Sequence, residues 1–222
     1  MTERSDRFLN ALLTAAAITI AAVVVRREFF AGTPARAETL KPEFVPEWKD
    51  FLSSGRLVGN TEAGVKIVEF SDLECPFCKA FHASVRAIMK ERPDQVAFTF
   101  IHYPLDNHRF ARPAARALEC APTEADFAQL LDLLYAKQDS LGLKAWTAYA
   151  ADAGIVDTAA FARCTADTAR VEAIEVGVAL GERLGVHLTP TILLNGWRYH
   201  GGMPQAQLDA VIKRLLAGKN PS

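Results

Sequence analysis

The chain lacks an excess of charge of either sign. Its 25 lysine and arginine residues nearly balance its 26 aspartate and glutamate residues, which leaves a formal net charge of −1 at pH 7 over 222 residues. Proteins that attract nucleic acid usually carry a basic field or a basic patch, and the overall composition supplies no such field. We therefore expect no nucleic-acid partner and look for function in local chemistry.

Cysteine is also scarce, and its spacing restricts what it can do. Of the four cysteines, only Cys75 and Cys78 lie close together, and Cys120 and Cys164 are far apart. A structural zinc site of four cysteines needs a second closely spaced pair, which this chain does not have. We expect no metal or organic cofactor. A module in which both thiolates of the close pair hold zinc or copper is the alternative from a different class.

Charge is absent from an 18-residue run near the start, Phe8–Val25. As a helix rising about 1.5 Å per residue, this run would span roughly 27 Å, close to the hydrocarbon thickness of a membrane. We expect a transmembrane anchor there, with residues 1–7 in the cytoplasm and residues 26–47 as a tether. A cleaved signal peptide is the alternative, because residues 35–37 (Ala-Arg-Ala) resemble a cleavage site. The length of the apolar run, and the charged residues that follow it, favour the anchor.

The stretch from residue 65 to residue 90 has the pattern of a strand, a turn and a helix. Proline is favoured at the first helical position, so Pro76 predicts a helix that starts there with Cys75 as its N-cap. The preceding residues predict a strand buried on both faces, as in the middle of a sheet. Its apolar residues are Val65, Ile67, Val68 and Phe70.

The two close cysteines are expected to differ in reactivity. The helix N-terminus offers unpaired N–H groups and a positive dipole end, which favour a thiolate at Cys75. Cys78 lies one turn further, on the apolar stripe of the helix. We therefore expect an exposed, activated sulfur at Cys75 and a sheltered one at Cys78. Such a pair can perform thiol–disulfide exchange, in which the first thiolate attacks and the second thiol resolves the mixed disulfide.

Glu69 lies on the same face of the strand as Val65 and Ile67. A carboxyl group on an apolar face is desolvated, which raises its pKa, and it could accept the proton that Cys78 loses during resolution. The alternative is a glutamate at the strand end that reaches solvent. The alternation of side chains along a strand does not by itself distinguish the buried carboxyl group from the solvent-exposed one.

The run VKIVEFSDLECPFCKAFH resembles the active-site stretch of the thioredoxin superfamily, and in particular its DsbA-like branch of thiol–disulfide oxidoreductases. In that branch a strand ending in Glu-Phe leads to Cys-Pro-x-Cys. The resemblance implies that Cys75 is the nucleophile, Cys78 the resolving cysteine and Glu69 the proton-transfer acid. Pro76 and Phe77 would then lie at the substrate-binding surface. Phe77 departs from the pattern, because the best-known oxidants of the branch have there a histidine that helps stabilise their thiolate.

The resemblance also implies an α/β, thioredoxin-like fold over residues 48–222, with a helical subdomain inserted at about residues 107–185. The sequence itself predicts a second strand at residues 96–103, parallel to the first. It predicts a hairpin turn at residues 195–196 and a closing helix at residues 204–216.

Helix ends can be placed within the expected insertion. Thr123 and Asp157 are candidate N-caps, and Gly154 and Gly185 are candidate helix ends. Apolar residues recur there at helical spacing, for example Phe127, Leu130, Leu131 and Leu134.

Thr189 and Pro190 stand just before a strand-like run at residues 191–194. Sequence alone favours a trans peptide bond between them. The resemblance implies instead a cis-proline loop beside the active cysteines. Pro190 would then be part of the active site, and the Thr189 backbone would pair with an extended substrate segment.

Cys120 and Cys164 each fall in an apparent helix of the insertion and have three possible states. They could form a structural disulfide, be two buried thiols, or form a second redox pair. Neither has a feature that would activate a thiolate, which disfavours the redox pair. An even number of cysteines outside the cytoplasm favours the structural disulfide.

The sequence thus leads to one functional hypothesis. A membrane-anchored thiol–disulfide oxidoreductase donates the Cys75–Cys78 disulfide to reduced protein substrates outside the cytoplasm, and a membrane redox partner resets the pair. The alternative within the same fold is a reductase or isomerase that acts on disulfide-bonded proteins. The lysine and arginine residues that follow the anchor would by themselves keep the domain in the cytoplasm, but long domains often translocate despite such charges. The extracytoplasmic location rests on the resemblance.

Overall fold

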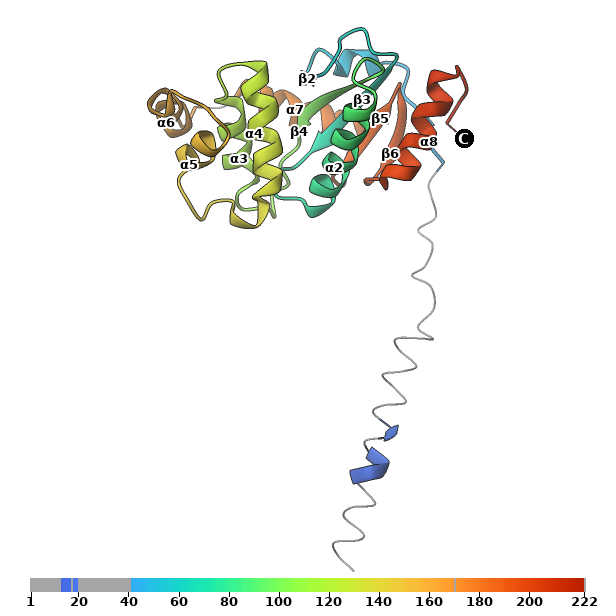
Figure 1. Ribbon diagram of the computed structural model, residues 1–222, viewed down its shortest axis with the longest axis horizontal. Coiled ribbons are helices and arrows are strands. Elements are labelled where there is room, and N and C mark those ends of the chain that lie inside the picture. Colours follow the sequence, from blue (N-terminus) through green and yellow to red (C-terminus); the bar gives the residue numbers. More distant parts are fainter. Residues whose placement is uncertain (1–12, 17, 20–40, 170, 222) are drawn as a thin grey trace, which may run out of the picture. The chain divides into compact units, whose positions relative to one another are not determined.

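The computed structural model describes residues 13–16, 18–19, 41–169 and 171–221 (Figure 1). Residues 13–16 and 18–19 are helical, and the rest of the expected anchor lies outside the described residues, as do residues 1–7 and 26–40. Among the residues that are described, no helix is both long enough and apolar enough to cross a membrane. The chain from residue 41 onward forms a compact unit of its own.

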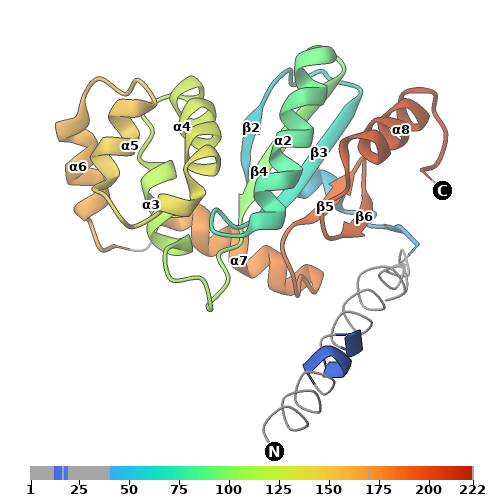
Figure 2. The same cartoon turned by 60° about the horizontal axis from the view of Figure 1, so that its bottom comes forward.

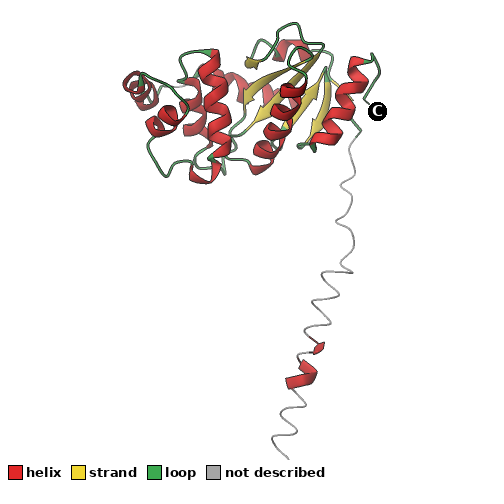
Figure 3. Cartoon of the chain, in the orientation of Figure 1, coloured by secondary structure: helices red, strands yellow, loops and turns green. Residues whose placement is uncertain are grey.

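A six-stranded sheet forms the centre of this unit, and Figure 3 shows it in yellow among the helices. The order of its strands is β1-β6-β5-β3-β4-β2. β3 and β4 are parallel, as the sequence predicted, and the other neighbouring pairs are antiparallel. β3 lies inside the sheet and packs against helices on both of its faces, which explains why its sequence is a nearly continuous apolar run. The strands are β1 (Glu43–Phe44), β2 (Arg56–Val58), β3 (Val65–Ser71), β4 (Val96–His102), β5 (Thr191–Leu194) and β6 (Trp197–His200).

Helices cover both faces of the sheet. One apolar cluster joins α2 and α8 to the face that carries Val65 and Ile67. A second cluster joins η1 and α7 to the face that carries Val68 and Phe70. Figure 2 shows α3 to α6 grouped at one end of the sheet and α8 at the other. The helices are η1 (Trp48–Phe51), α2 (Pro76–Glu91), α3 (Ala111–Glu119), α4 (Glu124–Ala136), η2 (Gln138–Ser140), α5 (Trp146–Asp152), α6 (Thr158–Ala166), α7 (Glu172–Leu184) and α8 (Gln205–Leu216).

The domain begins earlier than the predicted boundary at residue 48. Residues 43–44, which we assigned to the tether, form β1 and pair with β6, and Val45 is buried. A strand of two residues is too short to show an alternating pattern, so the sequence could not reveal it.

The inserted subdomain also ends earlier than residue 185. α7 packs against β4 as part of the second layer of helices on the sheet, so the subdomain comprises α3 to α6. Two glycines permit this close approach. A Cβ atom at Gly177 would lie 2.2 Å from the His102 carbonyl oxygen, and one at Gly181 would lie 2.3 Å from the Tyr103 ring. Helical periodicity identifies α7 as a helix but does not say which layer it joins.

The predicted helix caps are confirmed. The side chains of Thr123 and Asp157 accept hydrogen bonds from backbone N–H groups in the first turns of α4 and α6. Gly185 ends α7 in a left-handed conformation with φ of 71°, and Gly154 has φ of 89°.

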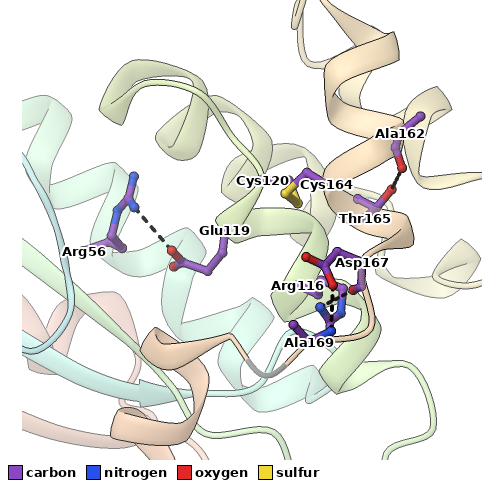
Figure 4. The surroundings of a disulfide bond; sticks show 9 residues. All are labelled: Arg56, Arg116, Glu119, Cys120, Ala162, Cys164, Thr165, Asp167 and Ala169. Atoms are coloured by element: carbon purple, nitrogen blue, oxygen red, sulfur yellow. Dashed lines mark hydrogen bonds and ion pairs between the residues drawn. A yellow bond between two sulfur atoms is a disulfide. The ribbon is translucent and has the colours of Figure 1, made fainter.

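A disulfide joins Cys120, at the end of α3, to Cys164 in α6 (Figure 4). Of the three states considered for these cysteines, the structure has the bonded one. Beside the bond, Arg116 donates a hydrogen bond to the carbonyl oxygen of Asp167, and Glu119 forms an ion pair with Arg56. The bond therefore links α6 to a helix that is itself tied to the sheet.

Removal of this disulfide by the double substitution Cys120→Ala and Cys164→Ala should lower the free energy of unfolding by up to about 4 kcal/mol. The bond closes a loop with a sequence separation of 44 residues, and opening it returns that conformational freedom to the unfolded chain. The melting temperature should fall by roughly 8–16 °C. Urea unfolding followed by circular dichroism without reductant measures the change. Cys75→Ala/Cys78→Ala is the matched control, and an unchanged midpoint in the first variant would show that the bond does not stabilise the fold.

Candidate active site

The Cys-Pro-Phe-Cys segment lies at the junction of β3 and α2, as predicted. Cys75 is the N-cap of α2, with extended backbone angles (φ −76°, ψ 120°), and Pro76 is at the first helical position. Both Cys75 and Cys78 are free thiols, so the structure represents the reduced state. The helix thus presents its N-terminal N–H groups at the first sulfur.

The expectation that Cys75 is exposed is wrong, because only 4% of the residue is accessible, compared with 0% of Cys78. The loop before β5 lies against the first sulfur, and the Cys75 thiol donates a hydrogen bond to the Thr189 carbonyl oxygen at 3.3 Å. A loop more than a hundred residues away along the chain provides this contact, so neither the helix position nor the local sequence could predict it.

The two thiols nevertheless have opposite tendencies to ionise. A hydrogen bond from Cys78 is the first cause that lowers the pKa of Cys75 to about 5, and burial opposes it. The Thr189 side chain and the backbone of Cys78 and Phe77 lower it further. Among the residues that the structure describes, the buried Thr189 hydroxyl has no other hydrogen-bond partner, so it is free to donate to a thiolate. Burial first, and then the neighbouring Cys75 and Glu69, raise the pKa of Cys78 well above its usual value.

Glu69 is fully buried, so the reading in which it reaches solvent does not apply. Burial raises its pKa to about 8, against the opposing effect of a hydrogen bond from Ser71. The Ser71 hydroxyl donates to Glu69 Oε1 at 2.7 Å, whereas Oε2 has no hydrogen-bond partner among the described residues. Cys78 lowers the pKa of Glu69 and Glu69 raises the pKa of Cys78, so the ionisation of the carboxyl group and of the second thiol is coupled.

The remaining predicted site residues lie around the first sulfur. The peptide bond between Thr189 and Pro190 is cis, as the resemblance implied. Pro76 and Phe77 are exposed, and 70% of Phe77 is accessible to solvent. Leu188, which precedes Thr189 in the loop that contacts Cys75, is also exposed, so Phe77 and Leu188 supply apolar surface on the two segments that meet at this sulfur.

Asp72 is a site residue that sequence reasoning missed. It is buried, and its backbone N–H lies 3.5 Å from the Cys78 sulfur. One carboxylate oxygen accepts from the Glu74 N–H at 2.7 Å, and the other contacts the Leu105 N–H and His108 Nδ1 at 2.7 and 2.8 Å. Asp72 therefore ties the active-site turn to the loop after β4. An aspartate directly after a strand predicts a turn, but no local signal pairs it with a histidine 36 residues later.

Two residues of the inserted subdomain also reach the site and were missed. Gln138 Nε2 donates to the carbonyl oxygens of Leu73 and Cys75 at 2.8 and 3.0 Å. The hydroxyl of Tyr135 lies 2.6 Å from the hydroxyl of Ser71. Both contacts bridge more than 60 residues of sequence, so only the fold brings these groups together.

Three of the histidines each contact a different carboxylate, and the other two, His187 and His200, are exposed. His102 and His108 have five residues between them, a spacing that zinc ligands also use, but they contact different carboxylates. His102 pairs with Glu119 at 2.9 Å, His108 pairs with Asp72, and His82 pairs with Asp132 at 2.7 Å. In the part of the chain that the structure describes, no group of three or more histidine, cysteine, aspartate or glutamate side chains could hold a metal ion.

A strand that leads into Cys-Pro-x-Cys at a helix N-terminus, faced by a cis-proline loop and backed by a buried acid, is an arrangement suited to thiol–disulfide exchange. Residues 52–214 match the family model described as thioredoxin, and the chain belongs to that family. Its fold is that of DsbA-like proteins, as similar solved structures show.

Three of these solved structures illustrate the similarity. BdbD from Bacillus subtilis has a TM-score of 0.66 at 22% identity and covers 81% of this chain and 98% of its own. α-DsbA1 from Wolbachia pipientis has a TM-score of 0.63 at 24% identity, over 74% of this chain and 92% of its own. DsbA2 from Pseudomonas aeruginosa has a TM-score of 0.58 at 26% identity, over 72% and 92%.

The curated relatives are much longer proteins. The Na(+)/H(+) antiporter NhaA 3 of Salinispora tropica is 33% identical over 160 residues, which cover 72% of this chain but 24% of that protein. The chain thus spans about a quarter of the length of such relatives. Most of each of these antiporters therefore lies outside the aligned region.

Proposed function

We propose that this chain is a thiol–disulfide oxidase that donates the Cys75–Cys78 disulfide to reduced protein substrates. The observation that carries the proposal is the asymmetry of the two thiols, with a lowered pKa at Cys75 and a raised pKa at Cys78. A sulfur that is stable as a thiolate is a good leaving group. When a second substrate thiol attacks the mixed disulfide between the substrate and Cys75, Cys75 therefore leaves readily and the substrate is released with its own disulfide.

The exchange proceeds in two steps. A substrate thiolate attacks the Cys75 sulfur of the oxidised pair, the bond to Cys78 breaks, and its electron pair stays on the Cys78 sulfur. Glu69, neutral near pH 7 because its pKa is raised to about 8, supplies the proton that Cys78 takes up. A second substrate thiolate then attacks the substrate sulfur of the mixed disulfide and releases Cys75 as a thiolate. The substrate is oxidised and the active-site pair is reduced.

Thiolate stability at Cys75 favours the oxidising direction. The pKa falls from an ordinary value of 9.0 to about 5, so the stabilisation of the reduced state is complete above pH 9 and disappears as the pH falls below 5. At pH 7, about two units above the lowered pKa, the thiolate stabilises the reduced state by roughly 3 kcal/mol, which raises the reduction potential of the pair by about 60 mV. Cys78 stays protonated because its pKa is raised, so it does not add to this stabilisation of the reduced state.

The proposal includes an anchor at Phe8–Val25 and a domain outside the cytoplasm. The uncharged run supports the anchor, and the Cys120–Cys164 disulfide supports an oxidising compartment, where such bonds persist. A pair that has oxidised a substrate must be reoxidised, so we infer a membrane redox partner that resets it.

A disulfide reductase or isomerase is the second candidate, and Phe77 is the observation that favours it. This side chain stands where the best-known oxidants have histidine, and it carries no group that could donate to the Cys75 thiolate. The thiolate would then depend on the hydrogen bonds from Cys78 and Thr189 and on the helix N-terminus alone.

The reduction potential of the Cys75–Cys78 pair distinguishes the two candidates. The full-length chain is equilibrated with mixtures of reduced and oxidised glutathione, and the reduced fraction is measured by alkylation and mass spectrometry. We expect a potential above about −180 mV, towards the −120 mV of strong oxidants. A value near −270 mV, as in thioredoxin, would overturn the oxidase and favour the reductase.

A further inference from the structure

Tyr135 is a buried titratable residue that the exchange mechanism above does not use. It belongs to α4 of the inserted subdomain, yet its hydroxyl reaches β3 and lies 2.6 Å from the Ser71 hydroxyl. Only 2% of Tyr135 and 1% of Ser71 are accessible. A buried hydroxyl is costly unless it is hydrogen-bonded, so this contact is a defined part of the site.

The direction of the hydrogen bonds follows from the number of protons. A serine hydroxyl has one proton to donate, and Ser71 donates it to Glu69 Oε1 at 2.7 Å. Tyr135 must therefore be the donor in its contact with Ser71. The three residues form a chain of hydrogen bonds that runs from Tyr135 through Ser71 to Glu69.

Ser71 also stands beside Cys78, because the backbone N–H of the next residue, Asp72, lies 3.5 Å from the Cys78 sulfur. In agreement with this placement, a hydrogen bond from Ser71 lowers the pKa of that thiol in opposition to its burial. The Ser71 proton thus has two possible acceptors, the Glu69 carboxylate and the Cys78 thiolate. Only one of them is negative at each stage of the proton transfer. Hydrogen bonds to charged acceptors are about twice as strong as those between neutral groups, so the proton should point to whichever group carries the charge.

We propose that Ser71 is a switchable hydrogen-bond donor that follows the negative charge between Glu69 and Cys78, and that Tyr135 holds it in place by donating to its oxygen in both states. Both are positioning residues for the proton transfer of resolution. The inference rests on the proposed exchange function and deepens it, because it gives the inserted subdomain a role in the chemistry.

The proton transfer itself is balanced between two groups. When the disulfide opens, the electron pair of the S–S bond stays on Cys78, the Glu69 O–H bond breaks and the Cys78 S–H bond forms. The Ser71 proton turns from Cys78 to Glu69 in the same event. In the reverse reaction Cys78 loses its proton to the Glu69 carboxylate and attacks the Cys75 sulfur of the mixed disulfide. The bond from Cys75 to the partner sulfur then breaks, and the partner leaves as a thiolate.

Tyr135 acts only as a donor in this scheme. Burial first, and then the charges of Cys78, Glu69 and Asp72, raise its pKa well above the usual value, so it stays protonated. His82, in α2, also faces Tyr135: the centroids of the two rings are 4.8 Å apart, and the His82 ring contacts the Asp132 carboxylate. From the loop after β4, His108 faces Asp72.

The substitutions Tyr135→Phe and Ser71→Ala test the proposal, and Tyr149→Phe is the matched control. Tyr149 is also buried in the inserted subdomain, but its hydroxyl donates to the Ser140 carbonyl oxygen and has no contact with Ser71 among the hydrogen bonds of the described residues. Reduced full-length chain is mixed with oxidised glutathione between pH 6 and pH 9, the reaction is stopped with acid, and mass spectrometry follows the mixed disulfide. Its formation reports attack by Cys75, and its decay reports resolution by Cys78.

We expect slower resolution at pH 7, by about tenfold in Ser71→Ala and about threefold in Tyr135→Phe. The pH midpoint of resolution should rise in both variants, because the hydrogen bond from Ser71 that stabilises the Glu69 carboxylate is lost or weakened. Formation of the mixed disulfide should be unchanged, and Tyr149→Phe should match the wild type in both steps.

If both variants resolve at the wild-type rate with the wild-type pH profile, the proposal is overturned while the exchange function stands. If Tyr135→Phe does not fold, Ser71→Ala alone decides by the same criteria. A wild-type chain that forms no mixed disulfide would instead overturn the exchange function, and this inference with it.

Discussion

Replacement of Cys75 by serine should reduce thiol–disulfide exchange by about a thousandfold or more. Every step of the proposed reaction forms or breaks a bond to the Cys75 sulfur, and a serine hydroxyl is neither a comparable nucleophile nor able to form a disulfide. Oxidation of a peptide that contains two reduced cysteines, followed by mass spectrometry, measures the rate. Full activity in Cys75→Ser would show that this pair is not the site of exchange.

Replacement of Cys78 by serine should have a different result. Cys75 can still attack a disulfide, but no second thiol can resolve the product, so mixed disulfides should accumulate and be visible on non-reducing gels. Cys120→Ala/Cys164→Ala is the control, and it should retain exchange because this disulfide links α3 to α6 within the inserted subdomain and takes no part in the proposed reaction. If this control lost exchange while remaining folded, the Cys120–Cys164 bond would have to take part in the reaction.

Replacement of Glu69 by glutamine should stabilise the reduced protein by up to about 5 kcal/mol at pH 8. The folded-state pKa of Glu69 is raised from 4.5 to about 8, since burial disfavours the carboxylate. Between these two pH values the unfolded chain has released a proton that the folded protein still holds. The free energy of unfolding of the wild type therefore falls as the pH rises through this window. Glutamine has a similar shape and no proton to release.

Urea unfolding at several pH values measures this effect. The difference between Glu69→Gln and the wild type should be small at pH 4.5, grow up to pH 8 and then level off. Glu62→Gln is the matched control, because Glu62 is exposed. A difference that does not depend on pH would mean that the Glu69 pKa is not raised. The same variant should exchange more slowly, since the amide cannot supply the proton that Cys78 needs.

Much of the fold could be predicted from local patterns. The apolar run of β3, Pro76 at the start of α2 and the caps Thr123 and Asp157 depend on the conformational preferences of neighbouring residues, and the structure has all of them. The boundaries at β1 and α7 were misjudged. They depend on a two-residue strand pairing and on the packing layer that a helix joins, and neither leaves a local pattern.

The sequence by itself determined which residues can carry the chemistry. Cys-Pro-Phe-Cys after a buried strand places a thiol at a helix N-terminus, because proline and the backbone N–H groups act within a few residues. Only the tertiary structure decided what surrounds those sulfurs. The Thr189 carbonyl contacts Cys75, and Tyr135 reaches Ser71 from the inserted subdomain. These groups lie far apart along the chain, and burial, which sets the pKa values of Glu69 and Cys78, exists only when distant segments pack together.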